Sequence, residues 1–358
     1  MKIKKILRFT IILIAIPIVY VLGVLVYATV TDYQPLREIN LKINPPSTQN
    51  ISTDTLTCLI WNIGYGGLGE EMDFFYDGGK QVRASKKLTD NYLKGINAFI
   101  KQHNTVDFVL LQEVDSASKR TYYINQIDLI NKSLPDFENA FALNYNVNFV
   151  PLPFALNYKP YGQAKAGLLS LSKYNQTAVK RFQYPGGFAW PESVFMLDRC
   201  FLEQAFLLPN GKNLYIINTH NTAYDATGLI KKEEMLFLKT HVDSLYNAGN
   251  YVLIGGDFNQ SPPGVDVLKF STNLPSGYTR ASLDLNVLPK NFKLGVDTTQ
   301  PTNRSLNKVY ASDKTVYKSI IDFFLLSPNL EIIKIETLKQ DFKNSDHEPV
   351  LIKFCIKK

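Results

Sequence analysis

Residues 251–262 read YVLIGGDFNQSP, an apolar run that ends in two glycines and is followed by Asp257 and Asn259. A short apolar run bounded by turn-forming residues predicts a buried β-strand. The two polar side chains therefore come at or just beyond the end of a strand. Taken alone, Asp257 fits a turn-forming role equally well.

Five other segments repeat this arrangement of polar groups at the end of, or within, an apolar run. They are TCLIWNIGYGG (57–67), VDFVLLQEVD (106–115), LYIINTHNTAYD (214–225), SIIDFFLLS (319–327) and KNSDHEPVLIKF (343–354), and they contain Asn62, Glu113, His220, Asp322, Asp346 and His347. Asp322 lies inside its apolar run, so its carboxylate needs a partner if it is buried. The other two histidines, His103 and His241, fall on predicted helices, and we expect them to be ordinary surface residues.

Together these side chains form a set suited to phosphoester hydrolysis. Glu113 and Asp346, with Asn62 nearby, offer the hard oxygen ligands that Mg²⁺ or Mn²⁺ prefers. Such an ion would neutralise a phosphate oxygen and the leaving alkoxide. Asp257 could orient or deprotonate an attacking water, and Asn259 could donate a hydrogen bond to a phosphate oxygen.

The two histidines of these segments complete the set. We expect His347 to hydrogen-bond the phosphate, with its tautomer fixed by a buried carboxylate such as Asp322. His220 could protonate the leaving group or bind the phosphate. A Ser-His-Asp hydrolase is disfavoured, because the sequence contains no G-x-S-x-G motif.

The ordered motifs WNI, QEV, NTH, GDFNQSP, IDFFLLS and SDHEPV resemble those of the endonuclease/exonuclease/phosphatase superfamily. The resemblance runs from about residue 57 to residue 357. It implies a four-layer α/β/β/α sandwich of two mixed β-sheets, with the active site at the edge where the strand ends gather. It also implies which residues form that site: Asn62, Glu113 and Asp346 at the metal, and His220, Asp257, Asn259, Asp322 and His347 in catalysis.

One segment departs from the pattern of this superfamily. GLLSLSKY (167–174) is similar to a strand with a Ser-Arg end, but Lys173 stands where arginine is usual. We expect the change to leave the active-site framework intact and to bear on substrate contacts. Some branches add a tyrosine or an arginine, for which Tyr158 and Lys165 are the candidates.

Between residue 55 and the carboxyl terminus, short β-rich runs alternate with two helical patterns. Helices are predicted over Lys86–Gln102 and Leu229–Tyr246. Strands are predicted over Leu56–Asn62, Phe108–Gln112, Gly167–Ser172, Cys200–Leu207, Leu214–Asn218, Tyr251–Gly255, Ile320–Leu326 and Val350–Ile356. Since no internal repeat or second linker occurs, we expect one catalytic domain over residues 55–358.

The first 54 residues differ from the rest. Residues 1–8 are basic, residues 9–30 are 22 residues without a charge, and residues 31–54 are polar and predict a linker. A helix over residues 9–30 would be about 33 Å long, enough to cross a hydrocarbon core of about 30 Å. A cleaved secretory signal shares this pattern, although no clear A-x-A site follows the run. The basic end predicts a cytoplasmic amino terminus with the domain outside the cytoplasm, secreted if the segment is cleaved.

Charge gives little guidance on the substrate. The net charge is +7, and removing the four basic residues among the first eight leaves 35 basic and 32 acidic residues, or +3. Nucleic-acid binding usually rests on many phosphate contacts, so this charge supports it weakly. A lipid phosphodiester suits a membrane anchor, and the aromatic stretch over residues 149–161 could touch lipid, frame a cleft or pack on the sandwich. Both a nucleic acid and a lipid phosphodiester therefore remain candidate substrates.

Two further functions are compatible with this set of residues beside phosphodiester hydrolysis. One is phosphomonoester hydrolysis in the same superfamily. The other is a catalytically inactive binding domain, which the intact Glu113, Asp257 and His347 disfavour. We infer no protein partner and expect a monomer.

The cysteines do not predict a disulfide framework. Cys58, Cys200 and Cys355 are odd in number and lie in strand-like runs, and no Cys/His cluster suggests zinc. Buried free thiols are expected, with one bond between two of them left open for an exported domain.

Overall fold

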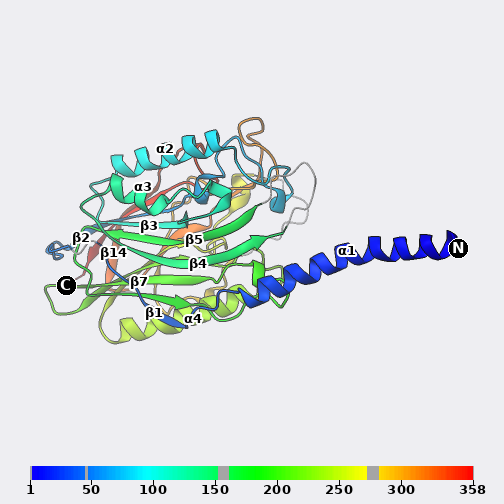
Figure 1. Ribbon diagram of the computed structural model, residues 1–358. Coiled ribbons are helices and arrows are strands. Elements are labelled where there is room, and N and C mark those ends of the chain that lie inside the picture. The colour runs from blue at the N-terminus through cyan, green and yellow to red at the C-terminus, as the bar shows by residue number, and fades with distance from the viewer. Residues whose placement is uncertain (1, 45–46, 152–160, 272–281, 358) are drawn as a thin grey trace.

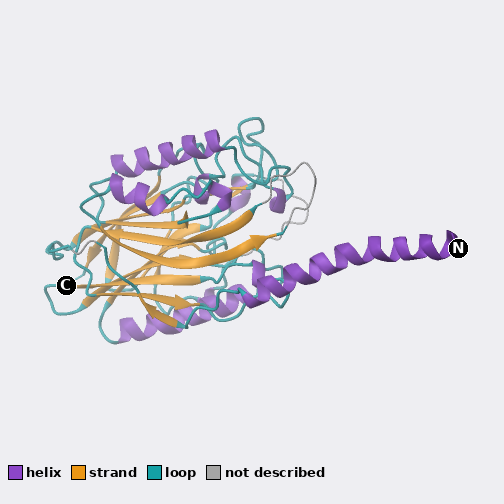
Figure 2. Ribbon diagram, viewed as in Figure 1, coloured by secondary structure: helices purple, strands orange, loops and turns teal. Residues whose placement is uncertain are grey.

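The computed structural model describes residues 2–44, 47–151, 161–271 and 282–357. Two β-sheets pack face to face, and helices cover the two outer faces, as Figure 1 and Figure 2 show. This arrangement confirms the expected four-layer α/β/β/α sandwich of two mixed sheets.

The first sheet has six strands in the order β14-β15-β2-β3-β5-β4. Their bounds are β2 Thr55–Asn62, β3 Phe108–Asp115, β4 Glu138–Val150, β5 Gly162–Ser172, β14 Leu330–Thr337 and β15 Val350–Ile356. β2 and β3 are parallel, and every other neighbouring pair is antiparallel. Since β5 runs against both β3 and β4, the strands β2, β3 and β4 all end at the same edge.

The second sheet has seven strands in the order β1-β6-β7-β8-β9-β13-β10. Their bounds are β1 Glu38–Asn40, β6 Ala178–Gln183, β7 Cys200–Leu207, β8 Asn213–His220, β9 Tyr251–Asp257, β10 Lys293–Gly295 and β13 Asp322–Leu326. Only β8 and β9 pair in parallel. A separate two-stranded ribbon joins β11 Asn303–Arg304 to β12 Lys318–Ser319.

Apolar faces explain how the layers hold together. The core between the sheets contains side chains from both, among them Ile60, Leu110, Ile216, Leu253 and Phe324. These residues are fully buried, and their removal from water is the main force that joins the sheets.

Three helices pack their apolar side chains on the outer faces of the two sheets in the same way. α2 (Lys86–Gln102) begins at Ser85, whose hydroxyl accepts a hydrogen bond from the Leu88 N–H. Its apolar face, with that of α3 (Gln126–Ser133), packs on the six-stranded sheet. α4 (Leu229–Asn247) packs Met235 and Leu238 on the other sheet.

Several expected elements are confirmed and others were missed. The strands over Cys200–Leu207 and Val350–Ile356 and the helix over Lys86–Gln102 have the predicted bounds, and α4 is one residue longer. The sequence patterns did not predict α3, the long strands β4, β6 and β14, or the short strands β1, β10, β11 and β12. β4 mixes apolar residues with asparagines, and β14 is an edge strand whose exposed positions are charged or apolar, so neither has a clean apolar run.

The segment over residues 31–54, expected to be a linker, is in part packed on the domain. β1 pairs with β6 at the sheet edge, the Asn44 N–H donates to the Asn139 carbonyl, and Ile51 is buried in the core between the sheets. Backbone pairing with an open sheet edge explains why a polar segment can be ordered here.

The amino-terminal helix α1 spans Lys2–Val30 and is long and apolar enough to cross a membrane. It projects away from the sandwich in Figure 1. The chain therefore carries one helix that is either a membrane anchor or a signal sequence. The three cysteines are free thiols in the structure; Cys58 and Cys200 are buried, as expected, whereas Cys355 is half-buried.

Candidate active site

The strand ends of both sheets meet at one edge and bring the polar side chains together. His220 at the end of β8 lies opposite Asp257 at the end of β9, and Asp257 lies opposite Asp322 at the start of β13. Asn62 lies at the end of β2 in the other sheet, and its amide nitrogen donates a hydrogen bond of 3.0 Å to Oδ2 of Asp257. The parallel pairing of β8 with β9 thus places side chains from distant motifs next to each other.

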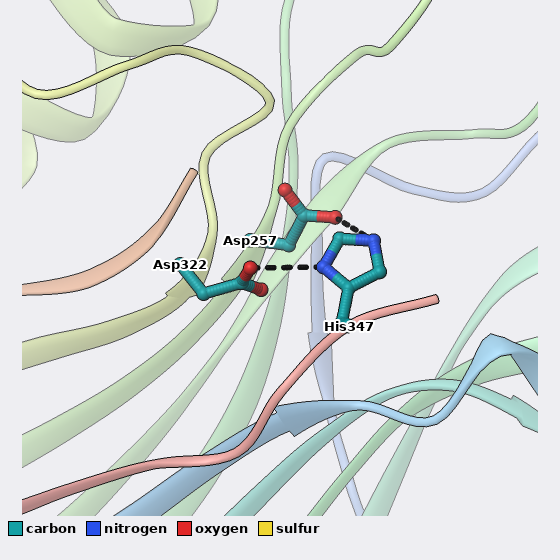
Figure 3. Close-up of side chains that lie close together, drawn as sticks. All are labelled: Asp257, Asp322 and His347. Carbon is teal, nitrogen blue, oxygen red and sulfur yellow. Dashed lines mark hydrogen bonds and ion pairs between the residues drawn. The ribbon is translucent and has the colours of Figure 1, made fainter. Parts of the chain in front are cut away.

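His347 lies between two buried carboxylates, as Figure 3 shows. Its Nδ1 is 2.9 Å from Oδ2 of Asp322, and its Nε2 is 3.7 Å from Oδ2 of Asp257. The expected support of His347 by Asp322 is therefore present in the geometry. A hydrogen bond from Nδ1–H to Asp322 leaves Nε2 pointing toward Asp257.

Burial and charge shift the pKa values of these groups in defined directions. Burial alone lowers the pKa of His347, but the surrounding carboxylates Asp322, Asp346 and Asp257 outweigh it and raise the pKa well above its usual value. Burial, reinforced by Asp322, raises the pKa of Asp257 to about 6. A carboxyl with such a pKa can exchange a proton near neutral pH, as a general base must.

Asn62 and Glu113 lie beside Asp257. The Asn62 amide nitrogen donates to Oε1 of Glu113 at 3.2 Å as well as to Asp257, while its oxygen accepts the Gly64 N–H at 3.0 Å. Glu113 has a φ of +55° at an irregularity in the β3–β5 pairing, which turns its side chain away from the regular alternation. Its side chain is 24% exposed, so it can reach a bound ion or water.

Asp346 is the most perturbed carboxyl near Glu113. Burial raises its pKa to about 7, and Glu113 adds to this effect, while His347 and Arg304 oppose it. Gly64 has a φ of +50°, and a Cβ there would lie 2.8 Å from Oδ1 of Asp346. The glycine therefore lets the backbone approach this carboxylate closely.

His220 is buried close to the same carboxylates. Its Nε2 is 3.5 Å from Oδ2 of Asp257 and 3.9 Å from Oε1 of Glu113. Burial, together with Arg199 and His347, lowers its pKa well below the usual value, so the ring is neutral. Within the described part of the chain, its Nδ1 has no hydrogen-bond partner.

Asn259 positions Asp257. With a φ of +50°, it directs its backbone N–H to Oδ1 of Asp257 at 2.8 Å. Its side-chain amide donates to the Asn221 carbonyl at 2.9 Å, so one amide hydrogen is already engaged. The Lys231 ammonium donates to the Asn259 carbonyl.

The structure adds three residues that the sequence reading did not single out. The Asn303 amide nitrogen is 3.1 Å from Nε2 of His347, and the Ser345 hydroxyl donates to the Asn62 carbonyl. The Thr302 hydroxyl accepts the backbone N–H of Asp322. Asn303 and Thr302 follow no apolar run, so only their packing against the strand ends identifies them.

Of the remaining sequence candidates, Lys173 lies away from the site, Lys165 lies at the active-site edge beside Ala166, and Tyr158 falls outside the described residues. Lys173 follows the end of β5 at the opposite edge, because β5 runs against β3, and its ammonium donates to the Thr105 carbonyl. The expectation that Lys173 bears on substrate contacts is therefore wrong. Lys165 lies half-buried on β5 opposite Asn146. Tyr158, with most of the aromatic stretch over residues 149–161, lies outside the described residues.

The two remaining histidines are partly buried. His241 packs against Phe182 and Phe201 and bonds Glu203 at 2.5 Å. The expectation that it is an ordinary surface residue is wrong, since α4 presents it to the sheet. His103 is half-buried at the end of α2, with its Nδ1 2.8 Å from the Phe99 carbonyl.

One group of described residues could hold a metal ion, because ligand atoms of Asp257, Asp322 and His347 all lie within 4.8 Å of one another. The separation of 2.9 Å between Nδ1 and Asp322 is that of a hydrogen bond, however, and a protonated Nδ1 cannot be a ligand. Glu113 and Asp346 form a second set of hard oxygen donors nearby. The carboxylates of this second set suit a divalent metal such as Mg²⁺ or Mn²⁺ by their chemistry.

Comparison with known proteins identifies a family whose sequence model matches most of this chain. The model of the "Endonuclease/Exonuclease/phosphatase family" matches residues 59–347. No match was found among curated proteins.

Solved structures share the fold at low sequence identity. An endonuclease/exonuclease/phosphatase from Beutenbergia cavernae has a TM-score of 0.57 and 16% identity over 85% of this chain and 72% of its own. TDP2 from D. rerio, solved with a single-strand DNA product, has a TM-score of 0.51 and 13% identity over 84% of this chain and 98% of its own. ANGEL2, described as a 2′,3′-cyclic phosphatase, has a TM-score of 0.51 and 15% identity over 90% of this chain and 99% of its own.

These structural likenesses support the fold, and the family match covers most of the chain, including every residue of the candidate site from Asn62 to His347. The candidate site lies at the shared edge of the two sheets. The chain belongs to the endonuclease/exonuclease/phosphatase family, whose members hydrolyse phosphoesters.

Proposed function

We propose that this protein is a divalent-metal-dependent phosphodiesterase that uses Asp257 to activate water. The observation that carries the proposal is the convergence of four groups on one buried carboxylate. Asn62, His220 and His347 all lie within 3.7 Å of Oδ2 of Asp257, and Asn259 holds Oδ1. Phosphomonoester hydrolysis by the same groups is the second candidate. The description of ANGEL2 as a cyclic phosphatase applies to that protein alone.

The residues divide the work according to their protonation. Asp257, with a pKa of about 6, is ionised at neutral pH and can accept a proton from water. His347, protonated and held by Asp322, can donate a hydrogen bond to a phosphate oxygen and stabilise the negative charge that develops there. His220 is neutral, so it orients water or substrate at this pH and supplies no proton.

We assign the metal to Glu113 and Asp346, with Asn62 beside them, and favour Mg²⁺ or Mn²⁺. Bound there, the ion would polarise the phosphoryl group and stabilise the leaving oxygen. The donor set fits, because both carboxylates are hard oxygen ligands and the partly exposed Glu113 leaves room for water. Asn62 directs its amide nitrogen to the carboxylates, so it would have to turn over to offer oxygen.

Glu113→Gln tests this assignment against the alternative group of Asp257, Asp322 and His347. We expect the Mg²⁺ concentration for half-maximal rate to rise about tenfold or more, because a charged ligand is replaced by a neutral one. The measurement is the initial rate of bis(p-nitrophenyl) phosphate hydrolysis across a Mg²⁺ titration. Asp322→Asn is the matched control and should lower the maximal rate while leaving the titration midpoint unchanged. A raised midpoint in Asp322→Asn, with an unchanged midpoint in Glu113→Gln, would instead assign the metal to the group of Asp257, Asp322 and His347.

Metal binding should depend on pH through Asp346. Its pKa of about 7 means that a proton competes with the cation, so Mg²⁺ affinity should rise about tenfold between pH 6 and pH 8. In the metal-free protein, folding favours the protonated carboxyl, so its contribution to stability declines as the pH rises from about 4 through about 7. Thermal unfolding with Mg²⁺ titrated at both pH values measures the effect. Asp346→Asn should abolish the pH dependence; an affinity that is the same at both pH values in the wild type would contradict it.

We also propose that α1 remains as an uncleaved membrane anchor, with the basic end in the cytoplasm and the catalytic domain outside it. The apolar helix and the basic residues that precede it support this orientation. We further propose that the protein is a monomer without a protein partner.

A further inference from the structure

We propose that α1 holds the active-site edge of the sandwich against the membrane surface, so that the enzyme acts on lipid phosphoesters in the headgroup layer. The inference rests on the phosphodiesterase function and the membrane anchor proposed above. It assigns the substrate class from the position of one helix relative to the strand ends.

Strand register places the attachment of α1 at the active-site edge. Asp115 of β3 and Tyr145 of β4 both pair with Ala166 of β5, so they lie at the same level along the strands. β4 then continues through Asn146 to Val150 toward the edge where β2 and β3 end. Glu113 is two residues before Asp115, so the tip of β4 projects beyond the level of the metal-binding carboxylate.

α1 contacts this projecting tip. Val24, Tyr27 and Ala28 line one small recess together with residues 146–149 of β4 and Val194. Ala28 is 8% exposed, whereas the helix before Gly23 is exposed along its length. Two strand spacings separate β4 from β3, so the helix joins the domain about 10 Å to the side of Glu113's strand.

The second sheet contacts the same part of α1. β6 runs parallel to β8, because both pair in antiparallel fashion with β7, so the β6–β7 loop lies at the active-site edge. In that loop, η4 (Ser193–Phe195) contacts the helix, and the Trp190 indole N–H donates to the Thr29 hydroxyl at 3.0 Å. The tip of a strand from one sheet and a loop from the other therefore hold the end of α1.

The length of the helix sets the level of the bilayer. The uncharged part of α1, residues 9–30, is about 33 Å long, and a hydrocarbon core of about 30 Å that begins just beyond Arg8 ends near Ala28. Arg8 then lies at the cytoplasmic interface, where a long basic side chain reaches water. The end of α1 that contacts the domain, Ala28 to Thr31, falls in the headgroup layer on the other side. Trp190, 60% exposed, lies at that level, where tryptophan is enriched in membrane proteins.

This placement favours lipid over nucleic acid. The catalytic side chains lie at the strand ends that face the bilayer, so a lipid phosphoester can reach them from the headgroup layer. A nucleic acid would have to enter between the domain and the membrane, and the mildly basic body of the chain offers it little attraction.

Fluorescence quenching tests the orientation without requiring activity. Ala226 lies in the exposed loop between His220 and α4, and Ala248 lies just beyond the other end of α4. The helix has 19 residues, so the two positions are about 28 Å apart along its axis. Full-length Ala226→Cys and Ala248→Cys, each with Cys355→Ser, would carry the same fluorophore in phosphatidylcholine vesicles that contain a headgroup spin-labelled lipid.

We expect strong quenching at position 226 and only the aqueous background at position 248. Equal quenching at both positions, or the reverse order, would overturn the orientation. Because the measurement reads position alone, it stands even if the protein hydrolyses none of the substrates tested.

A second experiment tests the substrate class with the full chain. A flexible Gly/Ser insertion of about 20 residues between Asp32 and Tyr33 would release the domain from its fixed position beside α1. We expect at least tenfold slower hydrolysis of sphingomyelin in phosphatidylcholine vesicles, with hydrolysis of soluble bis(p-nitrophenyl) phosphate within twofold of the wild type. Unchanged sphingomyelin hydrolysis, or a preference for single-stranded DNA, would overturn the proposal. If the wild-type protein does not hydrolyse the soluble ester, the result contradicts the phosphodiesterase function itself.

Discussion

Asp257→Asn is expected to reduce turnover by about 10²- to 10⁴-fold, the range in which a general base contributes. Asn62, His220 and His347 all point toward this carboxylate, and no other described carboxylate is shared by all three. Asparagine has the same shape but cannot accept the proton of the attacking water. The measurement is the single-turnover rate of bis(p-nitrophenyl) phosphate hydrolysis at saturating Mg²⁺.

The fold should survive this substitution. The pKa of Asp257 is raised to about 6, which means that folding disfavours the ionised carboxylate at higher pH. A neutral asparagine removes that penalty, so thermal stability at pH 7.5 should be retained or increased. Asp90→Asn is the matched control: Asp90 is exposed and pairs only with Lys86 at the surface in the described structure, and its loss should leave the rate unchanged. A rate within tenfold of the wild type for Asp257→Asn would exclude the proposed role in activating water.

His347→Ala is expected to lower turnover by about 10²- to 10³-fold, the effect of removing one preorganised donor to a developing negative charge. The imidazole lies between Asp322 and Asp257, and its raised pKa keeps it protonated at neutral pH. Alanine also leaves Asp322 buried with its Oδ2 unpaired, which should destabilise the fold by about 1–3 kcal/mol.

His347→Asn separates the two effects. An asparagine amide can replace Nδ1 as the donor to Asp322, so stability should recover, but no group remains at the position of Nε2. We therefore expect a well-folded protein that is as slow as His347→Ala. Thermal unfolding and kcat measured on both variants decide the matter: recovery of activity in His347→Asn would show that the histidine acts only by satisfying Asp322.

The candidate site was largely predictable because most of its residues lie at, or a few residues from, the end of a strand that is recognisable in the sequence. Asp257 ends a run of buried residues with two glycines, and Asp346 and His347 come shortly before β15. Burial on both faces requires such runs to be apolar, so a polar residue at their end is conspicuous. Asn303 and Thr302 lacked this signal, since they lie in and beside a two-residue strand whose neighbours are loops.

Lys173 shows where a local pattern misleads. Its motif is recognisable, but β5 runs against β3, so the carboxyl end of β5 lies at the edge opposite the catalytic residues. Strand direction follows from the connections between strands, and no property of the eight residues 167–174 encodes it.

By itself, the sequence determined the secondary structure of the long apolar segments, the order of the motifs and the chemical types gathered at the site, because these depend on local periodicity and on residue identity. Only the tertiary structure decided which strands are neighbours, that His347 lies between Asp322 and Asp257, and that the segment over residues 31–54 adds a strand to a sheet edge. It also decided that α1 joins the domain at the active-site edge, through Thr29, Trp190 and the tip of β4. Such contacts join residues from 25 to 161 positions apart, and their formation depends on the shape of the folded chain.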